Sequence, residues 1–190
     1  MSEALPSGEV YRFAGRFEST RLLKSSKGVD THLAIDLESG SSVVVKAAQT
    51  SHFSAPAERR LEHEAAALRD ASSRFRTPLL AFGHERDRFF LVIPFVQGIT
   101  LERRLAQGPL SVDETLAVGA CLLAALDDAH QHGVLHRDVK PGNVIVNDGV
   151  IREATLIDFG FSRSDWLDPA LRDEPVGTAL YLSPEQAGLL

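Results

Sequence analysis

The division of the chain into a strand-rich first half and a helical second half constrains its fold most strongly. One amphipathic helix is expected over 54–71, because Leu61, Ala65 and Leu68 recur there at helical spacing. A short helix is expected at 100–106, and a capping box that begins at Ser111 opens a long helix to about residue 130. The apolar side of this long helix is expected to carry Leu116, Leu123 and Leu126. Short apolar and β-branched runs predict strands at 10–17, 33–37, 42–47, 79–82 and 89–95. We therefore expect an α+β protein.

Two lobes follow from this pattern, with a hinge expected near Pro94–Gly98. The N-lobe is assigned to 1–97 and is expected to hold a five-stranded sheet and the helix at 54–71. The remainder, 98–190, is expected to be mainly helical up to Gly133. Beyond that residue the chain reads as loops with short strands at 144–146 and 155–157.

Charge and composition exclude several classes of function. The 190 residues carry 20 Lys and Arg against 26 Asp and Glu, a net charge of −6, which disfavours nucleic acid as a partner. Every apolar run is too short to span a bilayer, and the first residues do not form a signal peptide. The single cysteine, Cys121, permits no intrachain disulfide and is expected to be an inert core residue of a helix. We expect a cytoplasmic protein with no membrane span.

A polar block and its neighbours carry the chemistry. Residues 136–143 read His-Arg-Asp-Val-Lys-Pro-Gly-Asn, and Asp158-Phe159-Gly160 follows the apolar strand at 155–157. Lys46 ends the β-branched run 43–45, and Gly177-Thr178 and Ser183-Pro184-Glu185 lie downstream. In this order and spacing, the set resembles the signature of eukaryotic-like serine/threonine protein kinases. The resemblance implies the bilobal kinase fold.

The same resemblance implies ATP-dependent transfer of a phosphoryl group to a protein hydroxyl, with Mg²⁺ as cofactor. Such a reaction demands positioning and neutralisation of phosphate charge more than covalent work by the protein. Asp138 would accept the proton of the substrate hydroxyl, and Lys140 would hold the γ-phosphate. Asn143 and Asp158 offer the hard oxygen ligands that Mg²⁺ prefers, and Lys46 would grip the α- and β-phosphates.

An acidic partner for Lys46 is expected on the helix at 54–71. Helical periodicity disfavours Glu62 but leaves Glu58 and Glu64 open. The register of the kinase family, with a leucine four residues after the partner, selects Glu64, which is followed by Leu68.

The adenine site and the activation segment are assigned by the same resemblance. Ile93 would be the gatekeeper, the backbones of Pro94 and Val96 would meet the adenine edge, and Ile145 would form the pocket floor. Ordinary core packing explains these apolar residues equally well. The activation segment would contain Gly160, Thr178 and Glu185.

The phosphate-covering loop departs from the family pattern. Lys24, Ser26 and Val29 stand at the three positions where kinases carry glycine, and glycine normally lets the backbone approach the phosphates. This departure keeps open a pseudokinase-like module that binds nucleotide and transfers little. Lys140 disfavours a third hypothesis, a small-molecule phosphotransferase.

The segment 177–188 is similar to the N-terminal kinase domains of bacterial multidomain hybrid sensor proteins. This second resemblance implies signal transduction in bacteria, with ATPase and histidine-kinase modules as further parts of a longer chain. Because the sequence ends soon after Glu185, an incomplete C-lobe is expected, from a fragment or a truncated gene product.

Overall fold

Two compact units make up the chain. The computed structural model describes residues 11–26, 29–52, 62–63, 65–66, 69, 73–147, 150–159, 179–181 and 184. The first unit combines Met1–His52 with Leu80–Phe95, and the second combines Phe53–Leu79 with Val96–Leu190. The segment Phe53–Leu79 thus groups with the second unit, although it lies between the two parts of the first in the sequence. The division at residue 97 stays a prediction.

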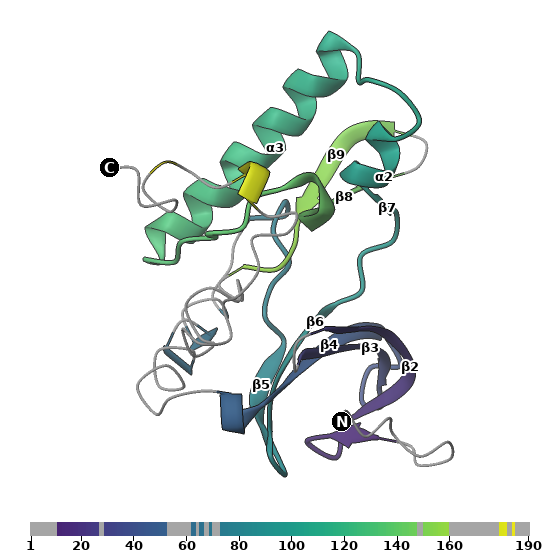
Figure 1. The fold of residues 1–190 in the computed structure, drawn as a ribbon, viewed down its shortest axis with the longest axis vertical. Coiled ribbons are helices and arrows are strands. Elements are labelled where there is room, and N and C mark those ends of the chain that lie inside the picture. Colours follow the sequence, from purple (N-terminus) through teal and green to yellow (C-terminus); the bar gives the residue numbers. More distant parts are fainter. Residues whose placement is uncertain are drawn as a thin grey trace. The chain divides into compact units, whose positions relative to one another are not determined.

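The first unit is built on an antiparallel sheet with the strand order β1-β2-β3-β4-β6-β5 (Figure 1). Its strands are β1 (Arg12–Phe13), β2 (Phe17–Ser26), β3 (Val29–Asp36), β4 (Ser42–Gln49), β5 (Ala81–Glu85) and β6 (Arg88–Pro94), and a 3-10 turn, η1 (Thr50–His52), follows β4. The sheet has one strand more than expected. The predicted strand at 10–17 is instead a hairpin, because Ala14 and Gly15 adopt left-handed φ angles of 51° and 66° and reverse the chain.

Alternation along the strands places the core of this unit on one face of the sheet. In β4, Val43, Val45 and Ala47 are buried while the residues between them are partly exposed, as the two-residue period of a strand requires. The cluster is completed by side chains from the neighbouring strands: Phe13, Phe17, Ala34, Phe90 and Val92. Each of its members is at most 2% exposed.

The second unit joins two helices to a three-stranded sheet of order β7-β8-β9. The helices are α2 (Leu101–Leu105) and α3 (Val112–Gln131), the strands are β7 (Ile99–Thr100), β8 (Val144–Asn147) and β9 (Val150–Leu156), and η2 (Pro141–Asn143) and η4 (Ala179–Tyr181) are 3-10 turns. The capping box is confirmed, since Ser111 and Glu114 exchange side-chain and backbone hydrogen bonds. The described residues contain no helix both long and apolar enough to cross a membrane.

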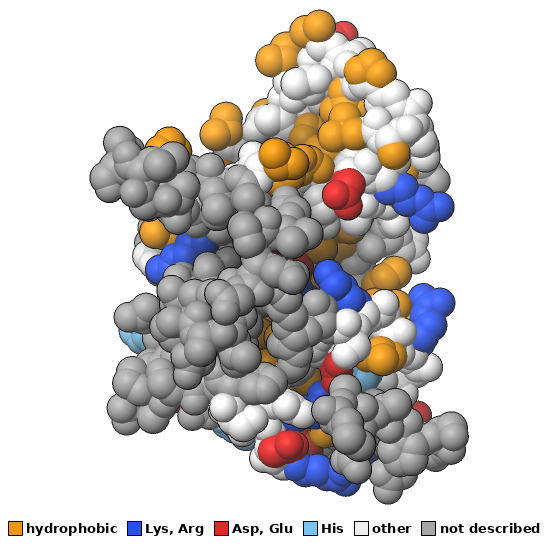
Figure 2. Space-filling view, in the orientation of Figure 1, with side chains coloured by type: hydrophobic (Ala, Val, Ile, Leu, Met, Phe, Trp, Pro, Cys, Tyr) orange, Lys and Arg blue, Asp and Glu red, His pale blue; other side chains and the backbone are white. Residues whose placement is uncertain are grey.

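The buried face of α3 differs from the one that the leucine spacing predicts. Leu116 and Leu123 are 68% and 70% exposed, and hydrophobic side chains lie on the surface over α3 (Figure 2). The residues that α3 buries are smaller: Val118, Cys121, Ala125, Asp128 and Ala129. Small side chains let α3 approach β9 closely, so packing against the strand selects this face. Cys121 is buried, as expected for a core residue.

The helix expected at 54–71 lies largely outside the described residues. Positions 62–63 and 65–66 are helical, and Ala65 is buried.

Candidate active site

The loop between α3 and β8 carries the predicted catalytic residues. Pro141 begins η2, where its fixed φ angle suits the turn and its missing N–H costs no hydrogen bond. The backbone N–H of Asn143 donates to the backbone carbonyl of Lys140 (2.9 Å), and the backbone N–H of Ile157 donates to the backbone carbonyl of Asn143 (2.9 Å). These bonds tie the end of the loop to the residues that follow β9.

Asp138 lies at the centre of this loop with its two carboxylate oxygens in different surroundings. Asn143 Nδ2 donates to Asp138 Oδ2 (2.9 Å) and to its backbone carbonyl (2.8 Å), and Lys140 Nζ lies 2.7 Å from the same Oδ2. Oδ1 is buried and accepts no hydrogen bond from any described residue. The carboxylate is therefore held through one oxygen, and the other is left as an acceptor.

The buried side chain of His136 connects the catalytic loop to the residues that follow β9. Its Nδ1 accepts from the amide of Asp138 (3.2 Å), so the ring proton of the neutral form lies on Nε2, which donates to the carbonyl of Ile157 (2.9 Å). Burial lowers the pKa of His136, and this outweighs the opposing effects of the Ile157 bond and the carboxylates of Asp158 and Asp138. The neutral ring is thus a structural link between the catalytic loop and the residues that follow β9.

Two residues of the site adopt a backbone conformation that is unusual outside glycine. Arg137 has φ 60° and Asp158 has φ 69°, both in the left-handed region. Such conformations persist where the surrounding structure dictates them, and they concentrate at functional sites. Asp158 is the second residue after the end of β9, and the next residue, Phe159, packs edge-on against His136 with ring centroids 4.6 Å apart.

The residues predicted to contact ATP are divided between the units. Lys46, Ile93 and Pro94 belong to the first unit, where Lys46 on β4 pairs with Leu91 on β6. Val96 and Ile145 belong to the second, and Ile145 on β8 pairs with Thr155 on β9. The four apolar residues of the predicted adenine site are each partly exposed.

Gly98 ends the predicted hinge, but the sequence assigned it no role. Gly98 has φ 139°, and a Cβ there would lie 2.4 Å from the carbonyl oxygen of Val146 and 2.9 Å from Ile145 Cγ2. Only glycine fits both the conformation and the space at this position. A lone glycine after a predicted strand could have indicated that another backbone segment approaches closely there. The sequence did not show that this segment is β8.

Several predicted residues lie outside the described ranges: Glu64, Gly160, Thr178 and Glu185. The positions that replace the family's glycines are described in part. Lys24 and Ser26 end β2, Val29 begins β3, and the two strands pair up to Ser26 opposite Val29. Asp30 accepts a hydrogen bond from Ser25 Oγ (2.6 Å) and forms an ion pair with Arg88.

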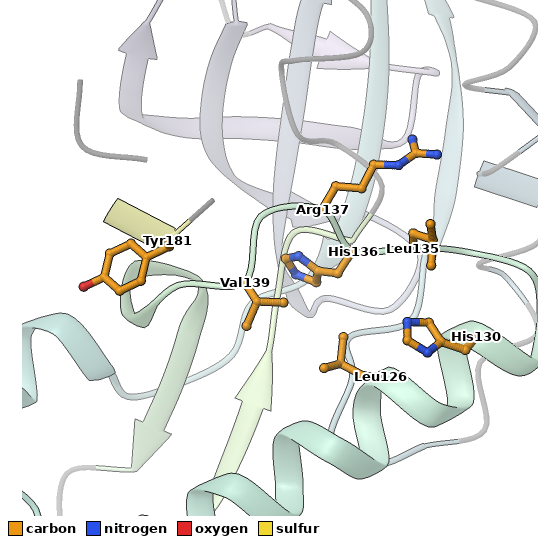
Figure 3. Close-up of a pocket in the computed structure, with 7 residues that line it drawn as sticks. All are labelled: Leu126, His130, Leu135, His136, Arg137, Val139 and Tyr181. Carbon is orange, nitrogen blue, oxygen red and sulfur yellow. The ribbon is translucent and has the colours of Figure 1, made fainter. Parts of the chain in front are cut away.

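A cavity of about 270 Å³ lies beside the catalytic loop in the second unit. Leu126 and His130 on α3, Tyr181 in η4 and the loop residues 135–137 and 139 line it (Figure 3). Its lining includes His136 and Arg137 of the catalytic loop but none of the residues predicted to bind ATP or metal. Among the described residues, no cluster of three or more His, Cys, Asp or Glu side chains forms a metal site.

Comparison with known proteins identifies the family. The model of the protein kinase domain family matches residues 27–188, so the chain belongs to that family. It is 30% identical over 191 residues to the probable serine/threonine-protein kinase pknA2 of Bifidobacterium longum, a match that covers 97% of this chain and 25% of the relative. It is 32% identical over 179 residues to the serine/threonine-protein kinase pkn2 of Myxococcus xanthus, covering 91% and 22%.

Solved structures support the same fold. The kinase domain of PknI from Mycobacterium tuberculosis superposes with a TM-score of 0.72 and 27% sequence identity, covering 84% of this chain and 63% of that structure. The expectations of an α+β, bilobal kinase fold and of a eukaryotic-like serine/threonine kinase domain are therefore confirmed. The chain spans about a quarter or less of the curated relatives named here.

Proposed function

We propose that this chain transfers the γ-phosphate of ATP to a serine or threonine hydroxyl of a protein substrate. The observation that carries the proposal is the asymmetric setting of Asp138. A buried acceptor without a hydrogen bond is rare in folded proteins and calls for an explanation. A substrate hydroxyl that donates to Oδ1 of Asp138 supplies that explanation, while Lys140 and Asn143 hold the other oxygen.

Asp138 would act as the acceptor of the hydroxyl proton and orient the attacking oxygen. Lys140 would neutralise charge on the γ-phosphate, and Lys46 would bind the α- and β-phosphates with Glu64 as its partner. Ile93, Pro94, Val96 and Ile145 would surround the adenine. Gly160, Thr178 and Glu185 would belong to the activation segment that binds the protein substrate.

The residues at the loop fit a magnesium ion. Both hydrogen bonds from Asn143 to Asp138 use Nδ2, which leaves the amide oxygen of Asn143 as a hard ligand. Asp158 would supply a carboxylate. Mg²⁺ bound with ATP would neutralise charge that develops on the transferring phosphoryl group.

The setting of this activity is proposed from the relatives and from Cys121. The relatives named above are bacterial serine/threonine kinases, which supports a role in bacterial signal transduction. A single cysteine permits no intrachain disulfide, which agrees with a reducing compartment, and we propose the cytoplasm.

A second candidate function is a regulatory module that binds nucleotide without efficient transfer. The observation that favours it is the β2–β3 hairpin, which carries Lys24, Ser26 and Val29 at the glycine positions and is paired up to Ser26 and Val29. Strands paired this far leave little freedom for the backbone to fold over phosphates.

Transfer and binding assays on one set of variants separate the two functions. The purified chain is given γ-labelled ATP, Mg²⁺ and a general protein acceptor, and MgATP binding is measured by calorimetry. Asp138→Asn should reduce transfer by about 10²–10⁴-fold, the usual contribution of a positioned proton acceptor, and should leave MgATP binding unchanged.

Asp127→Asn is the matched control, because Asp127 lies exposed on α3 and accepts from Gln131 Nε2 (2.9 Å). Binding of MgATP without transfer by the unmodified chain would favour the regulatory module. A chain that neither binds nor transfers would contradict both functions.

A further inference from the structure

A fully buried arginine lies over Phe159, the residue that follows the predicted metal ligand Asp158. The side chain of Arg76 has 0% exposure, and its Nε donates to Asp128 Oδ2 at 2.8 Å. Nη2 lies 2.8 Å from the same oxygen. Asp128 itself is buried in α3 at 6% exposure, so both charges of this pair are removed from water.

The guanidinium group of Arg76 also covers Phe159. Its Cζ lies 5.2 Å from the centre of the phenyl ring, within the range of a cation–π contact. Phe159 is 3% exposed and has His136 against its edge. The ring next to Asp158 therefore contacts both a neutral histidine and a buried cation.

Backbone contacts connect Arg76 to the same place. Arg76 forms a parallel bridge with Leu156, the last residue of β9. Leu156 N donates to the carbonyl of Phe75 (2.8 Å), and Thr77 N donates to the carbonyl of Leu156 (3.3 Å). The segment at 75–77 thus holds the strand end from which Asp158 emerges.

We propose that Arg76, oriented by Asp128, is a positioning residue that fixes Phe159 and thereby the carboxylate of Asp158. The proposal rests on the function proposed above, in which Asp158 binds Mg²⁺. A buried ion pair is a poor source of stability, because apolar residues of similar volume often pack as well. Its directional bonds can instead select one arrangement of the groups around it, here the ring of Phe159 above the end of β9.

The test compares three variants of the full chain. Arg76→Met removes the charge but keeps the length of the side chain, and leaves Asp128 buried without Arg76. Arg76→Met combined with Asp128→Leu removes both charges. Arg74→Met is the matched control, since Arg74 lies exposed in the same segment and covers Phe75 with its guanidinium 4.7 Å from the ring centre.

Two measurements are made on each variant. The first is the ratio of ATP affinities with Mg²⁺ and with EDTA, which reports on the placement of the metal ligand. The second is amide hydrogen exchange at Leu156 and Ile157, which needs no nucleotide. The melting temperature records overall stability.

We expect Arg76→Met to lower both the melting temperature and the metal-dependent gain in ATP affinity. The double variant should recover the melting temperature of the unmodified chain. Its Mg²⁺-dependent gain in ATP affinity should still be about tenfold smaller than that of the unmodified chain. About tenfold is the lower end of the loss in metal affinity usually seen when a residue that orients a metal ligand is replaced. Leu156 and Ile157 should exchange faster in it than in the Arg74→Met control.

A double variant with unchanged metal dependence and unchanged exchange would overturn the proposal and assign the pair a purely structural role. If the unmodified chain binds no ATP, the proposed function fails. The exchange measurement then decides separately whether Arg76 holds the end of β9.

Discussion

The hydrophobic cluster of the first unit and the surroundings of the catalytic loop in the second are built from different kinds of residue. In the first unit, the buried cluster is made of aromatic and aliphatic side chains such as Phe13, Val45 and Phe90. Around the catalytic loop of the second unit, the buried residues include Arg76, Asp128, His136 and Asn143, each at most 7% exposed. Apolar packing is non-directional, whereas hydrogen bonds and ion pairs depend on distance and angle.

This difference separates stability from function in the kinase domain. Apolar burial in the sheet contributes in proportion to area, and substitutions there should act mainly on folding. The polar contacts of the second unit fix the orientation of particular atoms, such as Asp138 Oδ2, and substitutions there should act mainly on chemistry. The predictions that follow test this separation, from the largest expected effect to the smallest.

Asp158→Asn should have the largest effect, an undetectable rate of phosphoryl transfer and weaker binding of MgATP. The amide keeps the size of the side chain but removes the charge that would hold Mg²⁺, so the melting temperature should change little. Filter-binding assays with labelled ATP and calorimetry check the outcome. Glu153→Gln, an exposed change on β9, is the control. Equal transfer rates in the unmodified chain and Asp158→Asn would contradict the kinase mechanism.

Phe90→Ala should destabilise the first unit by about 3–5 kcal/mol, the usual cost of deleting a buried phenyl ring. Phe90 is 2% exposed and packs on Phe13 with ring centroids 5.6 Å apart. Urea unfolding measures the change. The control is Phe95→Ala, which should lower the free energy of unfolding much less because Phe95 is 40% exposed. Equal losses in both variants would show that the sheet core is not the source of stability.

Lowering the pH should destabilise both units through two buried histidines. Burial lowers the pKa of His32 despite the carboxylate of Asp30, and burial also lowers the pKa of His136, each from 6.5. Below pH 6.5 the unfolded chain then binds more protons than the folded one. The histidines therefore leave the free energy of unfolding at its full value above pH 6.5. As the pH is lowered below 6.5, the free energy of unfolding decreases by at most about 1.4 kcal/mol per pH unit for each histidine.

Urea unfolding at pH 7.5 and pH 5.5 tests this pH dependence. His32→Asn should reduce the difference between the two conditions, because one proton-linked group is removed. His130→Asn, an exposed change on α3, should retain the wild-type difference. A chain that is equally stable at both pH values would contradict the assignment of neutral, buried histidines.

Leu123→Glu should have the smallest effect on stability, within about 0.5 kcal/mol, because the side chain is exposed. It should reduce aggregation of the 190-residue chain, since Leu116, Leu123 and Val112 all expose most of their surface on α3. Light scattering during heating measures this. Ala125→Glu, at a buried position on the same helix, should unfold the chain. A large loss of stability from Leu123→Glu would show that this face is packed.

Strong local signals account for what could be predicted. The Ser111 capping box, the strands at 42–47 and 89–95 and the sequence block from His136 to Asn143 depend on neighbours within a few residues. The two-strand hairpin at 12–26 was missed because Ala14 adopts a left-handed conformation that its residue type does not favour. The buried face of α3 was missed because leucine spacing takes no account of how closely a strand approaches.

The sequence by itself determined the family, the order of the main strands and helices and the identity of the polar residues in the catalytic loop. These follow from residue types and local spacing, which are properties of the chain. Only the tertiary structure decided that Asp138 is held through one oxygen, that Gly98 must lack a Cβ and that Arg76 covers Phe159. Each of these depends on atoms brought together from distant parts of the chain, where distance and angle set the energy and sequence spacing carries no information.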